Sequence, residues 1–328
     1  MHFSFMKRAK TIRFAVTGAS GFLGSHMVEF LKQKRHWVRA ITRKKQKESR
    51  RRYELADEVT YLDISSQKDT NKAFHHIDYV FHFAADMGGV GYFSKEQYYP
   101  FITNMLMDIH VLRSCEYNRV KRLFYPSSAC VYPIDAVKRL QTTKLKEDML
   151  IPANPDQMYG WEKFLITILA PYAPTEVRVG ILHTIFGVGQ QWQGQRAKFP
   201  PAIAYKVIES RRAGKPIHIW GDGTQIRTFL YITDALEKIY EVMMAWRYKG
   251  EVNISSDEQV TVKQCADWLC EFAGIQPRYI FEKSKPTGVI YRGVDNTKFK
   301  KLYSHRDKIT TKEGFRLVFE DLCKQLHR

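Results

Sequence analysis

The sequence predicts an α/β fold in which a doubly wound parallel sheet carries a smaller α/β lid. Three observations support this prediction. Short apolar strands alternate with helical segments in the first half of the chain, and a glycine-rich turn at 18–24 joins the first strand to the first helix. Gly18, Ala85 and Ser128 each stand at the end of such a strand. This pattern places all three at the edge where open parallel sheets bind their ligands.

The strands and helices of this sheet can be assigned in chain order. Apolar runs predict strands at 12–17, 37–42, 58–62, 78–85, 122–128 and 176–182, and helical periodicity predicts helices at 22–34 and 97–117. Because strands and helices alternate, the sheet is expected to be parallel with helices on both faces. Segments 228–246 and about 251–255 are expected to return to this sheet.

The same reading divides the chain into two parts. Residues 1–183, with about 228–255, are expected to form a dinucleotide-binding domain of the Rossmann type. Residues 184–227 and 256–328 are expected to form the substrate-binding lid, with one helix from about 201 to 212 and a C-terminal helix that starts with the capping box Thr310-Thr-Lys-Glu313. Neither an internal repeat nor a low-complexity linker is visible.

Composition places the chain among ordinary globular proteins. It has 328 residues and 44% hydrophobic content, no run of 18 apolar residues, and no signal-peptide pattern at its start, so we expect a cytoplasmic protein that does not enter a membrane. Its five cysteines are an odd number without a CxxC or Cys/His cluster, which argues against disulfides and against a metal site. Cys265 and Cys270 are expected to pack in a helix.

The net charge of +18 makes nucleic acid a partner to consider. However, the basic residues are spread along the chain, with one dense run at 43–52, and no nucleic-acid-binding motif accompanies them. We therefore consider nucleic-acid binding unlikely and favour a solvated basic face that attracts a nucleotide diphosphate.

Tyr159 and Lys163 are four residues apart, so on a helix they share one face. A nearby ammonium lowers the pKa of a tyrosine and favours the phenolate. Such a tyrosine can take a proton from a sugar hydroxyl while hydride leaves the same carbon for a nicotinamide. The pair alone is a weak signal, since many helices carry it on a solvated face. The preceding glycine turn and Ser127-Ser128 at a strand end strengthen it.

Several segments resemble a known family over almost the whole length of the chain. They are Ala84-Ala-Asp-Met-Gly-Gly89, Ser127-Ser-Ala-Cys-Val-Tyr-Pro133, Trp192-Gln-Gly-Gln-Arg-Ala-Lys198 and Trp220-Gly-Asp-Gly223 with Arg227. The chain resembles the extended short-chain dehydrogenase/reductases, a superfamily of nucleotide-sugar epimerases and dehydratases, and within it the GDP-mannose 3,5-epimerases. The resemblance implies that Tyr159, Lys163 and Ser128 oxidise the sugar, and that Cys130 and Lys198 move carbon-bound protons.

The implied chemistry is physically coherent. Oxidation of C4 of a hexose acidifies the C–H bonds at C3 and C5, because each carbanion delocalises into the new carbonyl group. Inversion then needs one group on each face of the ring, and a thiol and an ammonium can fill these roles if their pKa values approach the working pH. Reduction by the same cofactor closes a cycle without net redox change. On residue type alone, Cys130 would be a packed thiol and Lys198 a solvated lysine.

The resemblance also implies two sets of binding residues. The cofactor set is Gly18, Gly21, Phe22, Leu23, Gly24, Thr42, Arg43, Asp63, Ile64, Ala84, Ala85, Asn104, Tyr159 and Lys163. The substrate set is Gly88, Gly89, Ser128, Thr184, Trp192, Lys198, Arg227 and Arg292, with the two arginines as diphosphate clamps. Asp63 would contact the adenine, although an Asp at a strand end is often only a turn former.

Three departures from the family pattern affect the expected ligands. Where NAD-specific relatives have an acidic residue after the second strand, this chain has Thr42-Arg43-Lys44-Lys45. Basic residues there suit a 2′-phosphate, so the expected cofactor is NAD or NADP, with Arg43 favouring NADP. His183-Thr184 stands where the family has His-Asn, and Ile181 replaces a family arginine.

Two other functions remain open from the sequence. An NADPH-consuming GDP-4-keto-6-deoxymannose epimerase/reductase shares the Ser-Ser-x-Cys motif and the Gly-Gly loop, although Lys198 replaces the histidine of that family. A non-catalytic dinucleotide-binding regulator is possible on the same fold, but the intact set of Ser128, Tyr159 and Lys163 argues against it. By resemblance, the protein is expected to be a homodimer through the helices near 97–117 and 156–171.

Overall fold

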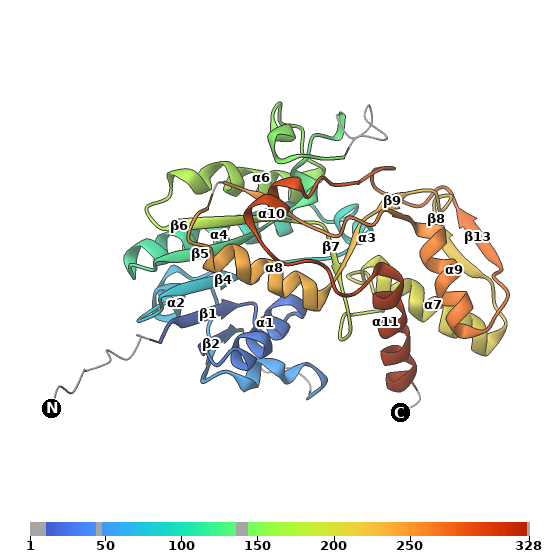
Figure 1. The fold of residues 1–328 in the computed structure, drawn as a ribbon, viewed down its shortest axis with the longest axis horizontal. Coiled ribbons are helices and arrows are strands. Elements are labelled where there is room, and N and C mark those ends of the chain that lie inside the picture. The colour runs from blue at the N-terminus through green and yellow to red at the C-terminus, as the bar shows by residue number, and fades with distance from the viewer. Residues whose placement is uncertain (1–10, 44–47, 136–143, 249, 327–328) are drawn as a thin grey trace.

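A computed structural model describes residues 11–43, 48–135, 144–248 and 250–326 (Figure 1). Its centre is a seven-stranded sheet with the strand order β11-β6-β5-β4-β1-β2-β3. Every neighbouring pair in this sheet is parallel. The strands are β1 (Arg13–Thr17), β2 (Trp37–Thr42), β3 (Glu58–Tyr61), β4 (Tyr79–His82), β5 (Arg122–Ser128), β6 (Glu176–Leu182) and β11 (Val252–Ile254).

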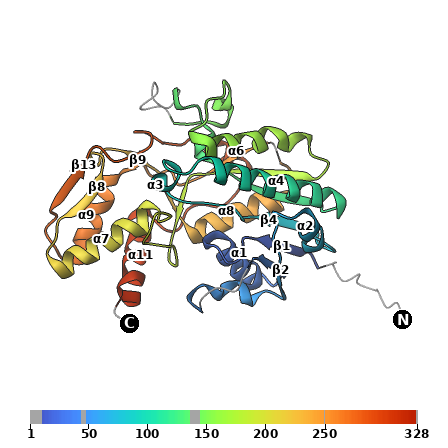
Figure 2. The same ribbon diagram turned by 180° about the vertical axis from the view of Figure 1, so that it is seen from behind.

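Helices cover both faces of this sheet (Figures 1 and 2). One face carries α1 (Phe22–Gln33) and α8 (Ile232–Met244), and the other carries α2 (Gln67–Ala73), α4 (Tyr98–Tyr117) and α6 (Gln157–Leu169). Each face has its own hydrophobic core, because strand side chains alternate between the two sides of a sheet. A sheet buried on both faces keeps its edge of strand ends open for ligands.

The lid stands beyond those strand ends. It contains α7 (Phe199–Ala213), α9 (Val262–Ala273) and α11 (Thr311–Leu326), which pack on one another, and the parallel pair β8 (Ile217–Trp220) and β13 (Tyr279–Glu282). Short pairs lie between lid and sheet: β7 (Thr184–Phe186) with β10 (Phe229–Tyr231), and β9 (Ile226–Arg227) with β12 (Val260–Thr261). The apolar core of the lid is continuous with the core under α1 and α8.

The remaining described elements are short. They are α3 (Val90–Phe93), α10 (Thr297–Leu302) and the helical turns η1 (Glu48–Leu55), η2 (Ala129–Val131), η3 (Glu147–Leu150) and η4 (Ala170–Tyr172). Two of them position the site described below. The turn η2 directly follows β5, and α3 follows the segment that leaves β4.

Most predicted elements are confirmed. The strands 37–42, 122–128 and 176–182 have the predicted bounds, the parallel sheet with helices on both faces is present, and Cys265 and Cys270 are buried in α9. The C-terminal helix begins at Thr311, and the Thr310 hydroxyl accepts a hydrogen bond from the Glu313 amide at 3.2 Å, as the capping box predicts.

The segment 228–246 returns to the central sheet as a covering helix and adds no strand to it. Most of this segment is helix α8, and its strand β10 pairs with β7 outside the central sheet. The apolar residues of α8 recur with helical rather than strand spacing, since Leu236, Ile239 and Met243 are all buried. Only β11, from the second predicted segment, joins the sheet. Within the described ranges, none of the helices has the length and apolar character needed to cross a membrane.

Candidate active site

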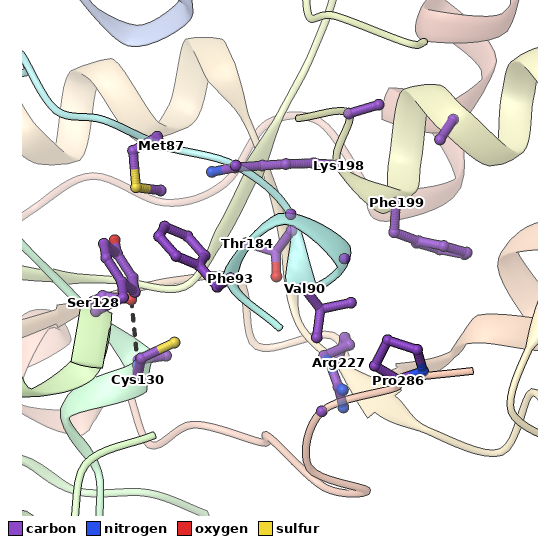
Figure 3. A pocket seen from close by; sticks show the side chains of 18 of the residues that line it. Met87, Val90, Phe93, Ser128, Cys130, Thr184, Lys198, Phe199, Arg227 and Pro286 are labelled. Carbon is purple, nitrogen blue, oxygen red and sulfur yellow. Dashed lines mark hydrogen bonds between the residues drawn. The ribbon is translucent and has the colours of Figure 1, made fainter. Parts of the chain in front are cut away.

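A cavity of about 1050 Å³ lies between the carboxyl ends of the central strands and the lid (Figure 3). Its wall brings together segments that are far apart in the sequence. Of the predicted site residues, the wall contains Phe22, Leu23, Ala84, Ala85, Gly88, Gly89, Ser128, Cys130, Tyr159, Lys163, Thr184, Trp192, Lys198, Arg227 and Arg292. The predicted oxidation, proton-transfer and substrate residues therefore share one chamber.

The glycine turn has the geometry of a dinucleotide cradle. Gly18 follows β1 with a φ of +61°, and a Cβ atom there would lie 2.6 Å from the amide nitrogen of Ala84. A Cβ on Gly24 would lie 2.2 Å from the carbonyl oxygen of Gly18. Both positions therefore require glycine, which lets the turn pack against β4 and against the start of α1. Gly21 precedes α1, whose first amides face the place where a pyrophosphate binds in this fold.

The edge expected to hold the adenosine ribose lies beside this turn. The Ser20 and Thr42 hydroxyls are 2.7 Å apart, and Arg43 is close enough to Asp63 to help lower the pKa of its carboxyl group. The Asp63 carboxylate also accepts hydrogen bonds from the amide and hydroxyl of Ser65, so it does form a turn. Ile64 is buried beneath this turn, and Lys44 and Lys45 lie outside the described residues. The edge offers hydroxyls and a cation directly after β2, where the sequence has no acidic residue.

Tyr159 lies on the first turn of α6 and faces the cavity. Its ring stacks on Phe93 with centroids 4.8 Å apart. Burial raises the pKa of Tyr159, while Lys163 and a hydrogen bond with Ser128 act in the opposite direction. The expected effect of Lys163 is therefore present, but burial outweighs it in the protein alone. The result is a neutral phenol, with a cation and a hydroxyl beside it that favour loss of its proton.

Lys163 reaches the same chamber from a buried position. Burial alone would lower its pKa, but Asp108 and Glu162 raise it above the ordinary value. Asn104, predicted as a cofactor residue, does not line the cavity. Its side chain accepts a hydrogen bond from the Asp86 amide at 2.6 Å and donates one to Glu162 at 2.9 Å. Asn104 therefore connects the segment after β4 to the carboxylate beside Lys163.

Cys130 lies on η2, and its thiol faces the chamber (Figure 3). Its amide donates to the Ser128 hydroxyl at 3.2 Å. Arg292 Nη1 lies 3.3 Å from the Cys130 sulfur, and Arg292 Nη2 forms an ion pair with Asp156 at 2.7 Å. The arginine predicted as a diphosphate clamp is thus seated against the thiol, and the sequence alone did not indicate this contact.

Lys198 caps the start of α7 and points into the cavity from the side opposite Cys130 (Figure 3). Burial lowers the pKa of Lys198, and the nearby Cys130 partly opposes this shift. Because this shift brings the pKa of Lys198 closer to neutral pH, Lys198 is better suited to exchange a proton than an exposed lysine.

The loop that carries Lys198 is docked on the segment after β4. Arg196 donates to the Met87 carbonyl oxygen at 2.9 Å and to the Tyr92 hydroxyl at 2.9 Å, and it is also ion-paired with Asp86. A Cβ atom on Gly89 would lie 2.6 Å from the carbonyl oxygen of Ala197, so the two segments touch through their backbones. Arg196 thereby fixes the loop next to the Gly88-Gly89 turn.

The substrate end of the cavity contains further donors. Arg227 donates to the carbonyl oxygens of Val289 at 2.7 Å and Thr287 at 3.2 Å, and burial lowers its pKa to about 9. The indole nitrogen of Trp192 and the Nε of Arg292 are both buried, and neither has a hydrogen-bond partner. Buried donors are normally paired, so these two fit a ligand that brings acceptor oxygens. Thr184 lines the wall beside His183, whose pKa burial lowers to about 3.

Comparison with known proteins supports the family expected from the sequence. Residues 14–255 match the NAD dependent epimerase/dehydratase family. A GDP-mannose 3,5-epimerase of Arabidopsis thaliana is 31% identical over 326 residues, which is 98% of this chain and 84% of the relative. GDP-L-fucose synthase 1 of the same plant is 25% identical and covers 97% of this chain and 95% of its own length.

The fold also matches solved structures. UDP-glucose 4-epimerase of Thermotoga maritima, solved with UDP-glucose, superposes with a TM-score of 0.82. The alignment covers 96% of this chain and all of that one at 22% identity, so it supports the fold alone.

Proposed function

This chain belongs to the NAD dependent epimerase/dehydratase family, and we propose that it acts as a GDP-mannose 3,5-epimerase through a transient 4-keto sugar. The observation that carries this proposal is the presence of four groups in one chamber. Tyr159 and Ser128 are the groups for the sugar hydroxyl, and Cys130 and Lys198 enter the same cavity from different parts of its wall (Figure 3). A simple 4-epimerase has no need of the second pair.

The proposed cycle assigns each proton to a residue. Tyr159 takes the proton of the C4 hydroxyl as its own phenol proton leaves toward Lys163, whose positive charge favours that loss, and Ser128 hydrogen-bonds at the same point. When bound, the dinucleotide supplies the hydride acceptor. With C4 a ketone, Cys130 and Lys198 remove and return protons at the neighbouring carbons from opposite faces. The restored hydroxyl then receives its proton from Tyr159, so the cycle has no net redox change.

The cofactor is proposed to be NAD or NADP, held by the glycine turn and the ends of β2 and β4. Gly18 and Gly24 allow the close backbone approach that a pyrophosphate needs, and Phe22, Leu23 and Ala84 line the adjoining wall. Arg43 next to Asp63, with hydroxyls at Ser20 and Thr42, favours NADP, because a 2′-phosphate would meet a cation and no carboxylate directly after β2.

The substrate is proposed to be a nucleotide-diphosphate sugar, with GDP-mannose taken from the relatives. Arg227 and Arg292 lie in the cavity wall, and Trp192 adds an unpaired indole donor. Two guanidinium groups and an unpaired donor suit a pyrophosphate, whose oxygens only accept hydrogen bonds. Thr184 stands at the position of the family amide, so the nucleotide base is assigned from the relatives and is decided by a direct substrate test.

The experiment for this function follows solvent deuterium into the sugar. The protein, incubated in D₂O with GDP-mannose and its dinucleotide, is expected to place deuterium at C3 and C5 without consuming the cofactor, as read by NMR of the product. Cys130→Ala should abolish this exchange and leave dinucleotide binding intact. Normal exchange in that variant would refute the role of Cys130.

A second candidate is the NADPH-consuming epimerase/reductase, and Arg43 is the observation that favours it. GDP-L-fucose synthases among the relatives are similar at a lower identity than the GDP-mannose 3,5-epimerase. Stoichiometric loss of NADPH absorbance with a 4-keto sugar would establish this function and rule out a redox-neutral epimerase.

We also propose a homodimer formed through α4 and α6. These helices pack side by side and expose a row of large apolar side chains: Ile102, Leu106, Ile109, Leu165, Ile168 and Leu169. A contiguous apolar surface of this kind marks an interaction site more often than free surface. We propose that a second copy of this chain covers this surface. The cytoplasmic location of the protein stays a prediction.

A further inference from the structure

The ammonium of Lys163 sits in a fully buried cluster that holds more negative than positive charge. Lys163 Nζ lies 2.7 Å from Glu162 Oε1 and 3.9 Å from Asp108 Oδ2, and it donates to the Tyr125 hydroxyl at 3.2 Å. Glu162 is 0% exposed and Asp108 is 2% exposed. One cation therefore faces two buried carboxylates, and this arrangement favours the uptake of one further proton.

The surrounding hydrogen bonds distinguish the two carboxylates. Asp108 accepts from the Tyr125 hydroxyl at 2.8 Å and pairs with His82 Nε2 at 2.9 Å, and the other ring nitrogen of His82 meets the Thr17 hydroxyl at 2.7 Å. Burial opposes ionisation of Asp108, but Lys163 and His82 lower its pKa below the ordinary value. Asp108 is therefore the carboxylate that stays ionised.

Glu162 is the carboxylate in direct contact with the Lys163 ammonium. Asn104 donates to its Oε2 at 2.9 Å, Lys163 contacts its Oε1, and the Tyr125 hydroxyl lies 3.4 Å away. Burial raises the pKa of Glu162 to about 7, with the charge of Asp108 adding to the effect and Lys163 opposing it. Two carboxyl groups whose environments separate their pKa values in this way can take different roles.

Lys163 connects this buried cluster to the cavity. Lys163 lines the cavity beside Tyr159, whereas Glu162 lies behind it and does not line the cavity. We propose that the Glu162 carboxylate stores the proton of the catalytic cycle: it receives, through Lys163, the proton that Tyr159 removes from the substrate hydroxyl, and it returns that proton when the carbonyl is reduced. This inference rests on the proposed function.

The step balances without any outside acid or base. The substrate O–H bond breaks and its proton passes to the Tyr159 oxygen, the phenol proton passes to Lys163, and an ammonium proton passes to Glu162. Tyr159 and Lys163 end as they began, and Glu162 changes from carboxylate to carboxylic acid. The electron pair of the broken C–H bond leaves as hydride to the nicotinamide dinucleotide. Reversal of each transfer restores the starting state, which suits an enzyme that must reduce the same carbon again.

A proton store has a defined pH dependence. Glu162 accepts a proton only when it is ionised, so sugar oxidation should slow as the pH falls through its pKa of about 7. The groups that face Glu162 are Lys163 beside it on α6, Asn104 and Asp108 on α4, and Tyr125 on β5. Replacement of Glu162 by glutamine removes the titration while it keeps an acceptor for Asn104.

The test follows the first oxidation under single-turnover conditions in the Cys130→Ala protein, which should stop at the ketone. The absorbance of the reduced nicotinamide reports the rate. With Glu162 present, the rate should rise with pH through a midpoint near 7. Glu162→Gln should lower the rate at least about tenfold and remove the midpoint, with dinucleotide binding unchanged. Glu162→Asp should restore a titrating limb. If Glu162→Gln shows the same rate and the same rise of the rate with pH, the proposal that Glu162 stores the proton is wrong.

A second readout needs neither substrate nor cofactor. The infrared carboxyl band of the protein alone should titrate near the same pH, and this band should be missing in Glu162→Gln. If no such band titrates, the store is overturned even where the glutamine variant fails to fold. If Glu162 had only a structural role, Glu162→Gln would lower the thermal stability of the protein and leave the pH dependence of the oxidation rate unchanged. Absence of any reduced nicotinamide in the parent protein would instead contradict the proposed function itself, and with it the store.

Discussion

Arg292 places its guanidinium 3.3 Å from the sulfur of Cys130, while its other nitrogen holds Asp156 at 2.7 Å. A permanent cation in contact with a thiol stabilises the negative charge that forms when the thiol gives up its proton. Burial opposes the charge on Arg292, but Cys130 and Asp156 together raise its pKa, so the guanidinium stays charged. The structure therefore joins a residue expected to bind phosphate with the residue expected to move a carbon-bound proton.

Arg292→Gln is expected to slow the reaction of Cys130 with iodoacetamide and to lower deuterium exchange into the sugar by about tenfold or more, because the thiolate loses its neighbouring cation. Arg292→Lys keeps the charge and should retain more of both. Mass spectrometry measures the alkylation, and the buried Cys115, Cys265 and Cys270 serve as internal references. Unchanged alkylation of Cys130 in the glutamine variant would show that the contact has no electrostatic role.

Arg196→Gln should reduce deuterium exchange by about tenfold, because the loop that carries Lys198 loses its contacts with Asp86, Met87 and Tyr92. Dinucleotide binding should not change, since Arg196 does not line the cavity and its contacts are with Asp86, Met87 and Tyr92 rather than with the glycine turn. Arg212→Gln, at the far end of α7, is the matched control and should exchange at the native rate. Equal loss in both variants would indicate a general effect of the lost charge rather than the docking of the loop.

Arg43→Ala is expected to weaken NADP binding by about tenfold and to leave NAD binding nearly unchanged, because only the former carries a phosphate at the ribose edge. Titration of protein fluorescence with each dinucleotide gives both constants. Lys32→Ala is a suitable control, since Lys32 is committed to an ion pair with Asp57 at 2.7 Å. A variant that binds both dinucleotides as the native protein does would remove Arg43 from the cofactor site.

The double variant Ile109→Glu with Leu165→Glu should convert the proposed dimer to a monomer, because two carboxylates would be buried without partners at the α4–α6 surface. Light scattering coupled to size-exclusion chromatography measures the mass. Ile280→Glu is the control, since Ile280 is similarly exposed on β13, away from these helices. A native protein that already elutes as a monomer would contradict the proposal.

The parts of the fold that depend on local sequence were predictable. The glycine turn at 18–24 and the strands 37–42, 122–128 and 176–182 follow from backbone requirements and from apolar runs. The segment 228–246 adds no strand to the central sheet, because its apolar residues recur with helical spacing and it packs on a face of that sheet as α8.

The contacts that tune the site could not be read from the chain. Phe93 stacks on Tyr159 and Arg292 reaches Cys130 across sequence separations of 66 and 162 residues, and no local pattern encodes either approach. Glu162 stands directly before Lys163, yet its role depends on Asn104 and Asp108 from α4, which only the packing of α4 on α6 reveals. Arg196 was visible only as part of a family-like segment.

The C–H bonds at C3 and C5 of the sugar are proposed to exchange only after C4 has been oxidised with the help of Tyr159. The most direct measurement compares solvent deuterium at C3 and C5 of GDP-mannose after incubation with the native protein and with Tyr159→Phe. The native protein is expected to exchange both positions without net loss of cofactor, and the phenylalanine variant to exchange neither, although it still binds the dinucleotide. Exchange at the native rate in Tyr159→Phe would contradict the account.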